Sequence, residues 1–173
     1  IAQSYLALAQ DGDVLVNVAS IAGHMLPSAM IPKRTFKLAF SDLAALQRKL
    51  ERSASRLPAA ARPGTAYSLS KAFVIWYSAA LAADFGARGA RVLSVSPGSF
   101  DTAMGRLEER SGSGKLVEFA ALKRFGEPDE VAEVLAFVAG RGPGYLTGTD
   151  ILVDGGTKAG LGLRGMVALA RSS

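Results

Sequence analysis

Three short apolar runs, separated by segments with helical periodicity, are the feature that most constrains the fold of this chain. The runs lie at residues 14–19, 91–96 and 151–153, and the first is a near-continuous series of valine and leucine. Runs of this kind are typical of strands buried on both faces of a parallel sheet. Helical segments are expected at residues 1–10, at about 65–85 and from 128 onward. Alternation of helix and strand predicts an α/β fold with a parallel sheet.

The longest helical segment, residues 65–85, carries Tyr67 and Lys71 four residues apart, on one face. An ammonium group near a phenol favours the phenolate, so such a phenol can give a proton to a carbonyl oxygen or take one from an alcohol. Pro63-Gly64 is expected to stop any helix before this segment. A Tyr–Lys pair also occurs on solvated helix edges, so the pair alone does not show that the tyrosine transfers protons. A separate apolar stripe is predicted at Leu69, Phe73, Trp76, Ala80 and Ala83.

Composition narrows the function classes. The 173 residues suffice for one domain with a core, and 49% hydrophobic with 20% charged residues is typical of a soluble globular protein. The absence of cysteine excludes disulfides and thiolate metal ligands, and His24 is the single histidine, so no metal site is expected. No apolar run is long enough to span a membrane, and the first residues lack the basic region of a signal peptide. A cytoplasmic location is therefore the expectation.

Residues 24–64 differ from the rest of the chain. Segment 33–62 carries eight basic and two acidic residues, whereas the remainder carries 12 and 13. Residues 41–57 predict an amphipathic helix, and we interpret 24–64 as an insertion that carries it. Its basic side is either a solvated face or a patch that attracts an anionic substrate or partner. Nucleic acid is not expected, because the basic residues do not alternate with aromatic ones. The apolar side of the helix is predicted at Leu43, Leu46, Leu50 and Leu57.

Polar and turn residues follow the predicted strands. Ser20 stands at the end of the first strand, where open α/β sheets place their sites. Residues 97–102 form a loop after the second strand. Residues 106–115 are polar and expected to be mobile, and 116–124 predict a short helix. Glu127-Pro128-Asp129-Glu130 is a helix start, and Gly155-Gly156 ends the third strand.

Five of these stretches, in order, resemble the C-terminal half of the short-chain dehydrogenase/reductase family. The insertion resembles that of bacterial 3α-hydroxysteroid dehydrogenase/carbonyl reductases. The resemblance implies part of a doubly wound Rossmann fold, and hydride transfer between NAD or NADP and a carbonyl or alcohol. The matching stretches are residues 16–23 (VNVASIAG), 67–71 (YSLSK), 95–104 (VSPGSFDTAM), 124–132 (RFGEPDEVA) and 146–156 (LTG to VDGG).

The resemblance also implies roles for single residues. Tyr67 is the implied general acid/base, Lys71 assists it and binds the nicotinamide ribose, and Ser20 donates to the substrate oxygen. Hydride arriving at a carbonyl carbon leaves negative charge on oxygen, which aimed donors stabilise. His24 is expected to be a loop histidine without a chemical role, although it follows Ser20 closely enough to border the substrate pocket. The residues implied to hold the nicotinamide, besides Tyr67 and Lys71, are Pro97, Gly98, Phe100 through its backbone, and Thr102.

The chain departs from the family in its phosphate-binding half. The glycine clusters at 111–114 and 140–144 do not follow a strand and open a helix, as a phosphate-binding turn must. We therefore expect residues 1–173 to be the C-terminal portion of one catalytic domain, without affinity for a dinucleotide on its own. Micromolar binding of NADH or NADPH to this polypeptide would contradict that expectation. The choice between NAD and NADP stays open.

Several functions remain open at this point. The first is an oxidoreductase of hydroxysteroids or of general carbonyl and alcohol substrates. The second is a 3-oxoacyl-carrier reductase, because a basic insertion suits an acidic carrier protein. The third is a non-catalytic scaffold with the same fold. The Tyr67–Lys71 spacing disfavours an enoyl reductase, since the enoyl reductases of this superfamily place the lysine further from the tyrosine. The resemblance favours a homodimer over a homotetramer, because the insertion would cover a helix used in tetramer contacts.

Overall fold

The computed structural model describes residues 1–102 and 113–162. The described residues form a parallel three-stranded sheet in the order β1-β2-β3, in which Val16 pairs with Leu93 and Val95 pairs with Ile151. The predicted parallel α/β fold is thereby confirmed. Along the chain the main elements are α1 (Ala2–Leu8), β1 (Val14–Val18), η1 (Ile21–His24), α2 (Lys33–Phe36), α3 (Leu43–Ser55), α4 (Arg62–Ala80), α5 (Ala82–Gly86), β2 (Arg91–Pro97), η5 (Ser113–Phe119), α7 (Pro128–Ala139) and β3 (Asp150–Val153).

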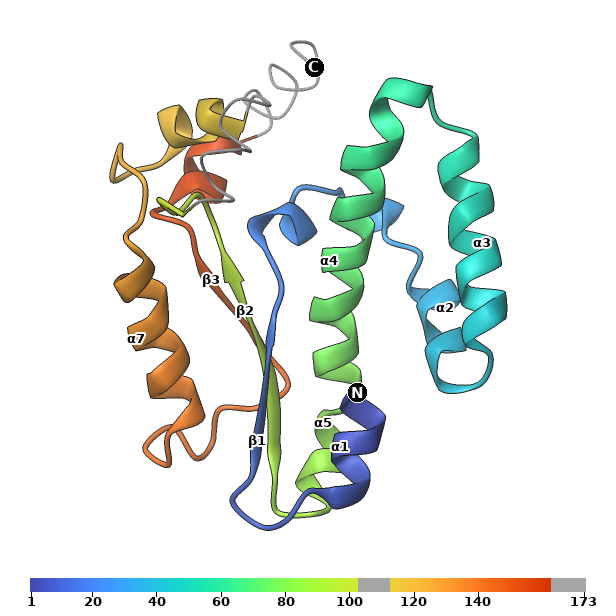
Figure 1. The fold of residues 1–173 in the computed structure, drawn as a ribbon, viewed down its shortest axis with the longest axis vertical. Coiled ribbons are helices and arrows are strands. Elements are labelled where there is room, and N and C mark those ends of the chain that lie inside the picture. Colours follow the sequence, from blue (N-terminus) through green and yellow to red (C-terminus); the bar gives the residue numbers. More distant parts are fainter. Residues whose placement is uncertain (103–112, 163–173) are drawn as a thin grey trace.

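Helices cover both faces of the sheet (Figure 1). Helix α7 lies on one face, α4 with α1 and α5 lies on the other, and α2 and α3 stand outside α4. On the α7 face the core is formed by Leu93 and Val95 of β2 and Val138 of α7, all fully buried. Their burial against the valines of β1 and the aliphatic residues of β3 follows from alternation along each strand.

The opposite sheet face is apolar at one end and polar at the other. Toward the start of the strands, Val92, Leu81 and Phe85 form a buried cluster with residues of α1. Further along, Asn17 of β1 donates to the Ser78 hydroxyl of α4 at 3.0 Å, and that hydroxyl donates to the Val74 carbonyl at 2.9 Å. Buried polar groups of this kind need partners, and within the described ranges no buried side-chain nitrogen or oxygen lacks one.

An aromatic cluster attaches α2 and α3 to the outer side of α4. The Phe36 side chain is fully buried, with its ring centre 5.2 Å from that of Phe73 and 5.6 Å from that of Trp76. Leu46 of α3 is buried against the same cluster. Helix α3 confirms the predicted amphipathic helix, and Asp42 caps its start by accepting from the Ala45 N–H at 2.8 Å. Leu43, however, was wrongly expected on its buried side and is 66% exposed.

The helix that carries Tyr67 differs from its predicted bounds. Pro63-Gly64 does not stop it but lies in its first turn, where proline removes no helical hydrogen bond. The helical path is interrupted at Leu81, and α5 continues it. Ala80 and Ala83 were wrongly placed on the apolar stripe and are exposed, whereas Tyr77, Leu81 and Phe85 pack inward.

Smaller differences concern short segments. The helix predicted at 116–124 is a 3₁₀ segment that ends at Phe119. Val18, expected to be buried, is half-exposed, and residues 157–162 are helical although the sequence pattern there is weak. Most of the polar segment expected to be mobile, residues 106–112, lies outside the described residues. No helix in the described part of the chain combines the length and apolar character needed to cross a bilayer.

Candidate active site

Ser20 lies two residues after the end of β1 and caps a single 3₁₀ turn, η1. Its Oγ accepts a hydrogen bond from the Ala22 N–H at 3.2 Å, and its carbonyl accepts one from the Gly23 N–H at 2.9 Å. The Ala19 N–H donates to the Val95 carbonyl at 2.8 Å, which fixes the start of the turn to β2. A serine hydroxyl that accepts from the backbone keeps its own proton for donation to another oxygen.

Gly23 brings this turn into direct contact with α4. A Cβ built at Gly23 would lie 2.8 Å from the Lys71 carbonyl carbon and 2.9 Å from the Ala72 nitrogen. Only a residue without a side chain allows two backbones to approach this closely. The turn that Ser20 opens is therefore packed against the helix that carries Tyr67, at the level of Lys71.

Tyr67 and Lys71 occupy the N-terminal half of α4. The Tyr67 side chain is 43% exposed, and the Lys71 Nζ lies 5.7 Å from the centre of its ring. The same Nζ donates to the Val18 carbonyl at 3.4 Å. Lys71 thus lies between the tyrosine and the end of β1, two residues before Ser20. This arrangement places an ammonium beside a phenol at the strand end from which Ser20 projects.

Pro97 and Gly98 leave the sheet at the same edge as Ser20. Pro97 is the last residue of β2, which is the parallel neighbour of β1, and the Gly98 N–H donates to the Val153 carbonyl at 2.8 Å. A Cβ at Gly98 would lie 2.7 Å from the Asp154 Cα, so glycine is required for this close approach. Two of the stretches with predicted site residues therefore meet at the carboxyl edge of the sheet, as open α/β folds lead one to expect.

The loop after Gly98 is anchored by backbone hydrogen bonds to Gly126. The Gly126 N–H donates to the Ser99 carbonyl at 3.0 Å, and the Asp101 N–H donates to the Gly126 carbonyl at 2.9 Å. Thr102 closes the loop locally through its N–H, which donates to the Phe100 carbonyl at 2.9 Å.

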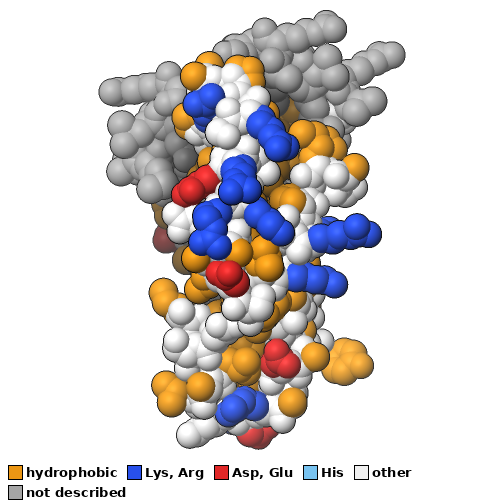
Figure 2. All heavy atoms as spheres, turned by 90° about the vertical axis from the view of Figure 1, so that its right-hand side faces the viewer, with side chains coloured by type: hydrophobic (Ala, Val, Ile, Leu, Met, Phe, Trp, Pro, Cys, Tyr) orange, Lys and Arg blue, Asp and Glu red, His pale blue; other side chains and the backbone are white. Residues whose placement is uncertain are grey.

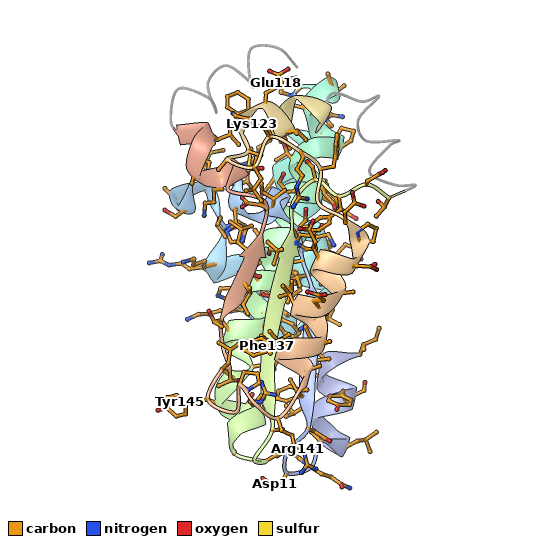
Figure 3. The ribbon with its side chains drawn as sticks, turned by 90° about the vertical axis from the view of Figure 1, so that its left-hand side faces the viewer. Asp11, Glu118, Lys123, Phe137, Arg141 and Tyr145 are labelled. Atoms are coloured by element: carbon orange, nitrogen blue, oxygen red, sulfur yellow. The ribbon has the colours of Figure 1, made fainter. Side chains whose placement is uncertain are left out.

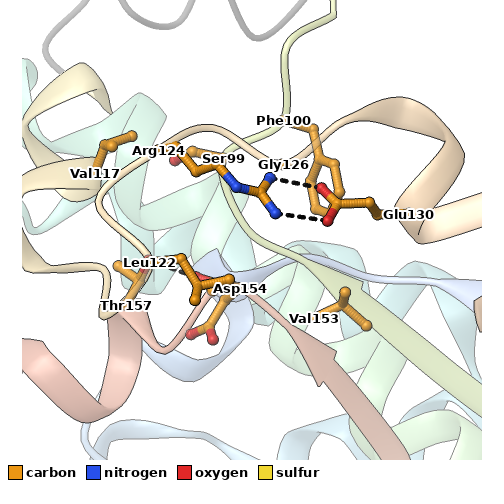
Figure 4. A pocket seen from close by; sticks show the side chains of 11 residues that line it. Ser99, Phe100, Val117, Leu122, Arg124, Gly126, Glu130, Val153, Asp154 and Thr157 are labelled. Carbon is orange, nitrogen blue, oxygen red and sulfur yellow. Dashed lines mark hydrogen bonds and ion pairs between the residues drawn. The ribbon is translucent and has the colours of Figure 1, made fainter.

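The Phe100 ring packs inward, beside a small cavity of about 80 Å³ (Figure 4). Arg124 and Glu130 form a bidentate ion pair at the rim of this cavity, with both N–O distances 2.7 Å. Hydrogen bonds from the Arg124 guanidinium and the Glu127 N–H lower the pKa of Glu130 to about 2. Ligand pockets usually measure about 300–1,000 Å³, so this cavity is too small for a nicotinamide. The Phe100 side chain is a packing group, which leaves only its backbone for the predicted cofactor contact.

His24 has partners that the sequence did not reveal. Its Nε2 lies 2.8 Å from Asp150 Oδ2, and its Nδ1 lies 3.3 Å from the Lys158 Nζ. Asp150 opens β3, and its other oxygen accepts from the hydroxyls of Ser94 at 2.5 Å and Ser96 at 2.9 Å. These contacts were not expected from the sequence, and the expectation that His24 has no chemical role stays a prediction. The one sequence feature that could have indicated these contacts is an acidic residue, Asp150, at the start of the apolar strand β3.

The environment of Asp150 favours its charged form. Burial would raise its pKa, but the hydrogen bonds from His24, Ser94 and Ser96 outweigh burial and lower the pKa below its ordinary value. Because an ionised carboxylate only accepts, His24 Nε2 must donate to it, and the Lys158 ammonium donates to Nδ1. The side chains of His24 and Asp150 are 18% and 8% exposed, so this pair is largely shielded from water, whereas Lys158 is exposed.

A second cavity, of about 520 Å³, lies beside His24 between η1, the start of α2 and α4. Ala72, Ile75 and Trp76 form its apolar wall, and Lys33 and Lys158 lie at its polar side. Ser20, Tyr67 and Lys71 are not among its lining residues. The cavity therefore belongs to a different face of α4 from the predicted catalytic pair.

Basic side chains of the segment 33–62, which runs from the start of α2 to the first residue of α4, gather on the outer surface over α2 and α3 (Figure 2). All eight are exposed, and only weak local pairing is present in the described part of this surface, such as Arg48 with Asp42 at 3.9 Å. The apolar side of α3 packs toward α4 through Leu46 and Leu50, so the charge is a property of the solvent-facing side.

The sequence of this chain is similar to a known family profile and to several characterised proteins. A family profile described as enoyl-(acyl carrier protein) reductase matches residues 52–158, more than half of the chain. A short-chain dehydrogenase/reductase, bsc3, of Alternaria brassicicola is 46% identical over 76 residues, which cover 42% of this chain and 28% of that protein. Human (3R)-3-hydroxyacyl-CoA dehydrogenase is 38% identical over 92 residues, covering 53% of this chain and 35% of that protein.

A solved structure extends the match to nearly the whole chain. The 3α-hydroxysteroid dehydrogenase from Pseudomonas sp. B-0831, complexed with NADH, aligns with a TM-score of 0.66 and 27% identity. The alignment covers 94% of this chain and 59% of that structure. The chain thus spans less than two thirds of the length of each of these relatives.

Proposed function

Because the chain belongs to the short-chain dehydrogenase/reductase family, in its C-terminal portion, we propose that the protein interconverts a hydroxyl and a carbonyl group with NAD or NADP. Since the chain spans only part of its relatives' length, the activity is assigned to the complete protein. The observation that carries the proposal is the position of Lys71, whose ammonium lies between the Tyr67 ring and the carbonyl of Val18.

The proposed chemistry uses three side chains. The nicotinamide supplies or accepts the hydride when it is bound. In the reducing direction Tyr67 gives its proton to the oxygen that gains negative charge, and the Ser20 hydroxyl donates to the same oxygen. Lys71 stabilises the phenolate that Tyr67 becomes. In the oxidising direction the phenolate takes the proton of the alcohol.

We propose that the cofactor binds at the same carboxyl edge of the sheet as Ser20. The ribose next to the nicotinamide would need a hydrogen-bond donor near the ends of the strands. The Lys71 ammonium lies close to both the last residue of β1 and the Tyr67 ring, so it can be that donor. Pro97 and Gly98, the backbone at Phe100 and Thr102 follow the neighbouring strand and would hold the carboxamide. The NADH bound by the Pseudomonas relative supports a nicotinamide cofactor and leaves the choice of NAD or NADP open.

The proposed substrate is a hydroxysteroid or another compact ketone or secondary alcohol. The alignment over 94% of the chain with a 3α-hydroxysteroid dehydrogenase, which includes the segment with α2 and α3, supports this class. A 3-oxoacyl thioester is the second candidate. It is favoured by the likeness to the hydroxyacyl-CoA dehydrogenase and by the basic surface of α2 and α3, which would attract an acidic carrier.

Reduction of a carbon–carbon double bond is the less favoured chemistry, despite the description of the matching family profile. Enoyl reductases of this superfamily place the lysine further from the tyrosine than the four-residue separation of Tyr67 and Lys71. Human (3R)-3-hydroxyacyl-CoA dehydrogenase acts, by its name, on a hydroxyl group.

The test is a spectrophotometric assay of the complete protein, following NADH and NADPH at 340 nm. A cyclic ketone, an acetoacetyl thioester and an enoyl thioester are compared at matched concentrations. We expect oxidation of the cofactor with the ketone above all. Preference for the acetoacetyl thioester would establish the second candidate, and turnover with the enoyl thioester alone would overturn the proposed reaction.

We also propose a homodimer for the complete protein. The outer side of α4 is covered by α2 and α3, which removes a surface for helix packing between subunits. Phe137 of α7 is 62% exposed and lies on the side of the molecule shown in Figure 3. Sedimentation velocity should give a dimer, and a stable tetramer would contradict this proposal.

A further inference from the structure

The turn that carries Ser20 is held at three places. Its start is fixed by the Ala19 N–H to Val95, its middle by the contact of Gly23 with α4, and its end by His24. The first two are backbone contacts. The third is a side-chain link to Asp150, 126 residues further along the chain.

Asp150 presents one of its two carboxylate oxygens to His24 in a fixed position. One of its oxygens accepts from the Ser94 and Ser96 hydroxyls, so the carboxylate cannot turn freely, and the other oxygen faces His24 Nε2. The Lys158 ammonium holds the opposite side of the imidazole. The ring is thereby fixed in one tautomer and one orientation, and the end of η1 is fixed with it.

We propose that the Asp150–His24 pair is a positioning device for Ser20, so that its hydroxyl is aimed at the substrate oxygen. Two hydrogen bonds transmit the position of His24 to Ser20: the turn is a single hydrogen-bonded unit in which the N–H groups of Ala22 and Gly23 bind the Ser20 side chain and carbonyl. The inference rests on the proposed function, and it assigns Asp150 and His24 to Ser20 and not to the substrate.

The decisive variant is Asp150→Asn, which keeps the volume but presents a mixed donor and acceptor to His24. We expect kcat to fall roughly 10- to 100-fold, because misplacement of a reacting group by about 1 Å can reduce rates by about 100-fold. The dissociation constant of the nicotinamide cofactor should change less than about twofold. The control is Ser96→Ala, which removes one donor to the same carboxylate but leaves the link to His24, and should reduce kcat far less.

A double-mutant cycle separates positioning from general destabilisation. In the Ser20→Ala background Asp150→Asn should have almost no additional effect on kcat, because the group it positions is gone. An equal loss of kcat in both backgrounds would overturn the proposal.

A readout without turnover keeps the proposal testable if no substrate is found. Hydrogen exchange at the amides of Ala22 and Gly23 should accelerate in Asp150→Asn, while the amides in the second half of α4 stay as protected as in the wild type. Unchanged exchange in the turn would overturn the proposal. A wild-type protein without activity on any carbonyl would refute the proposed function, and the exchange experiment would still decide whether Asp150 holds the turn.

Discussion

Replacing Gly23 with alanine tests directly how the turn after Ser20 is placed against α4. The new Cβ would lie 2.8 Å from the Lys71 carbonyl carbon, 2.9 Å from the Ala72 nitrogen and 2.8 Å from Ile75 Cδ1. The Ile75 methyl can rotate away, but the two backbone atoms cannot. The turn must therefore move away from the helix by several tenths of an ångström, to reach the roughly 3.4 Å of ordinary contact.

The expected loss of stability follows from overpacking, which typically costs about 1–3 kcal/mol. Gly64→Ala is the matched control, because Gly64 lies in α4, the helix that Gly23 contacts, with nothing within 4 Å of the new Cβ. There alanine should stabilise the protein by about 0.4–1 kcal/mol, since it restricts the unfolded chain.

Urea unfolding of the complete protein, with equal slopes for all variants, gives both free-energy changes. Because Ser20 moves with the turn, Gly23→Ala should also lower kcat by roughly 10-fold or more. Gly64→Ala should leave kcat unchanged. Wild-type stability and wild-type kcat in Gly23→Ala would refute the packing of η1 against α4.

Two further outcomes follow from the described contacts. Phe36→Ala should destabilise the protein by about 3–5 kcal/mol and alter the emission of Trp76, the single tryptophan, whereas Leu43→Ala, at an exposed position of α3, should stay within about 0.5 kcal/mol; equal effects would contradict the aromatic cluster. Because the pKa of Asp150 is lowered in the folded state, its ionised form contributes stability above its unfolded pKa of about 3.9, and this contribution is lost as the pH falls through the folded pKa. The difference in unfolding free energy between wild type and Asp150→Asn should therefore be present at about pH 5 and shrink as the pH falls below about 4, and a difference that grows below about pH 4 would contradict it.

The elements with strong local signals were predictable. The valine-rich run became β1, and the start of α7 was visible in Glu127-Pro128 and Glu130, which form a capping box in the structure. The aliphatic period in α7 packs on the sheet as predicted. These signals are local, so one sequence suffices to read them.

The features that depend on distant partners were not predictable. Pro63 looked like a helix stop, because only the tertiary context shows that it occupies the first turn of α4. The sequence showed no partner for His24, because Asp150 is far away along the chain and is brought near only by the parallel pairing of β2 and β3. The placement of Ser20 beside α4 required Gly23, whose function is visible only once its neighbours are known.

Replacing Tyr67 with phenylalanine tests the central claim most directly. The phenol is the proposed proton donor, and general acid–base catalysis contributes about 10²–10⁴-fold to the rate, so kcat should fall by at least about 100-fold. The cofactor should still bind within about twofold of the wild-type dissociation constant, because the Lys71 ammonium and the loop after Pro97 are retained. Turnover at the wild-type rate in Tyr67→Phe, with the cofactor bound, would contradict the account.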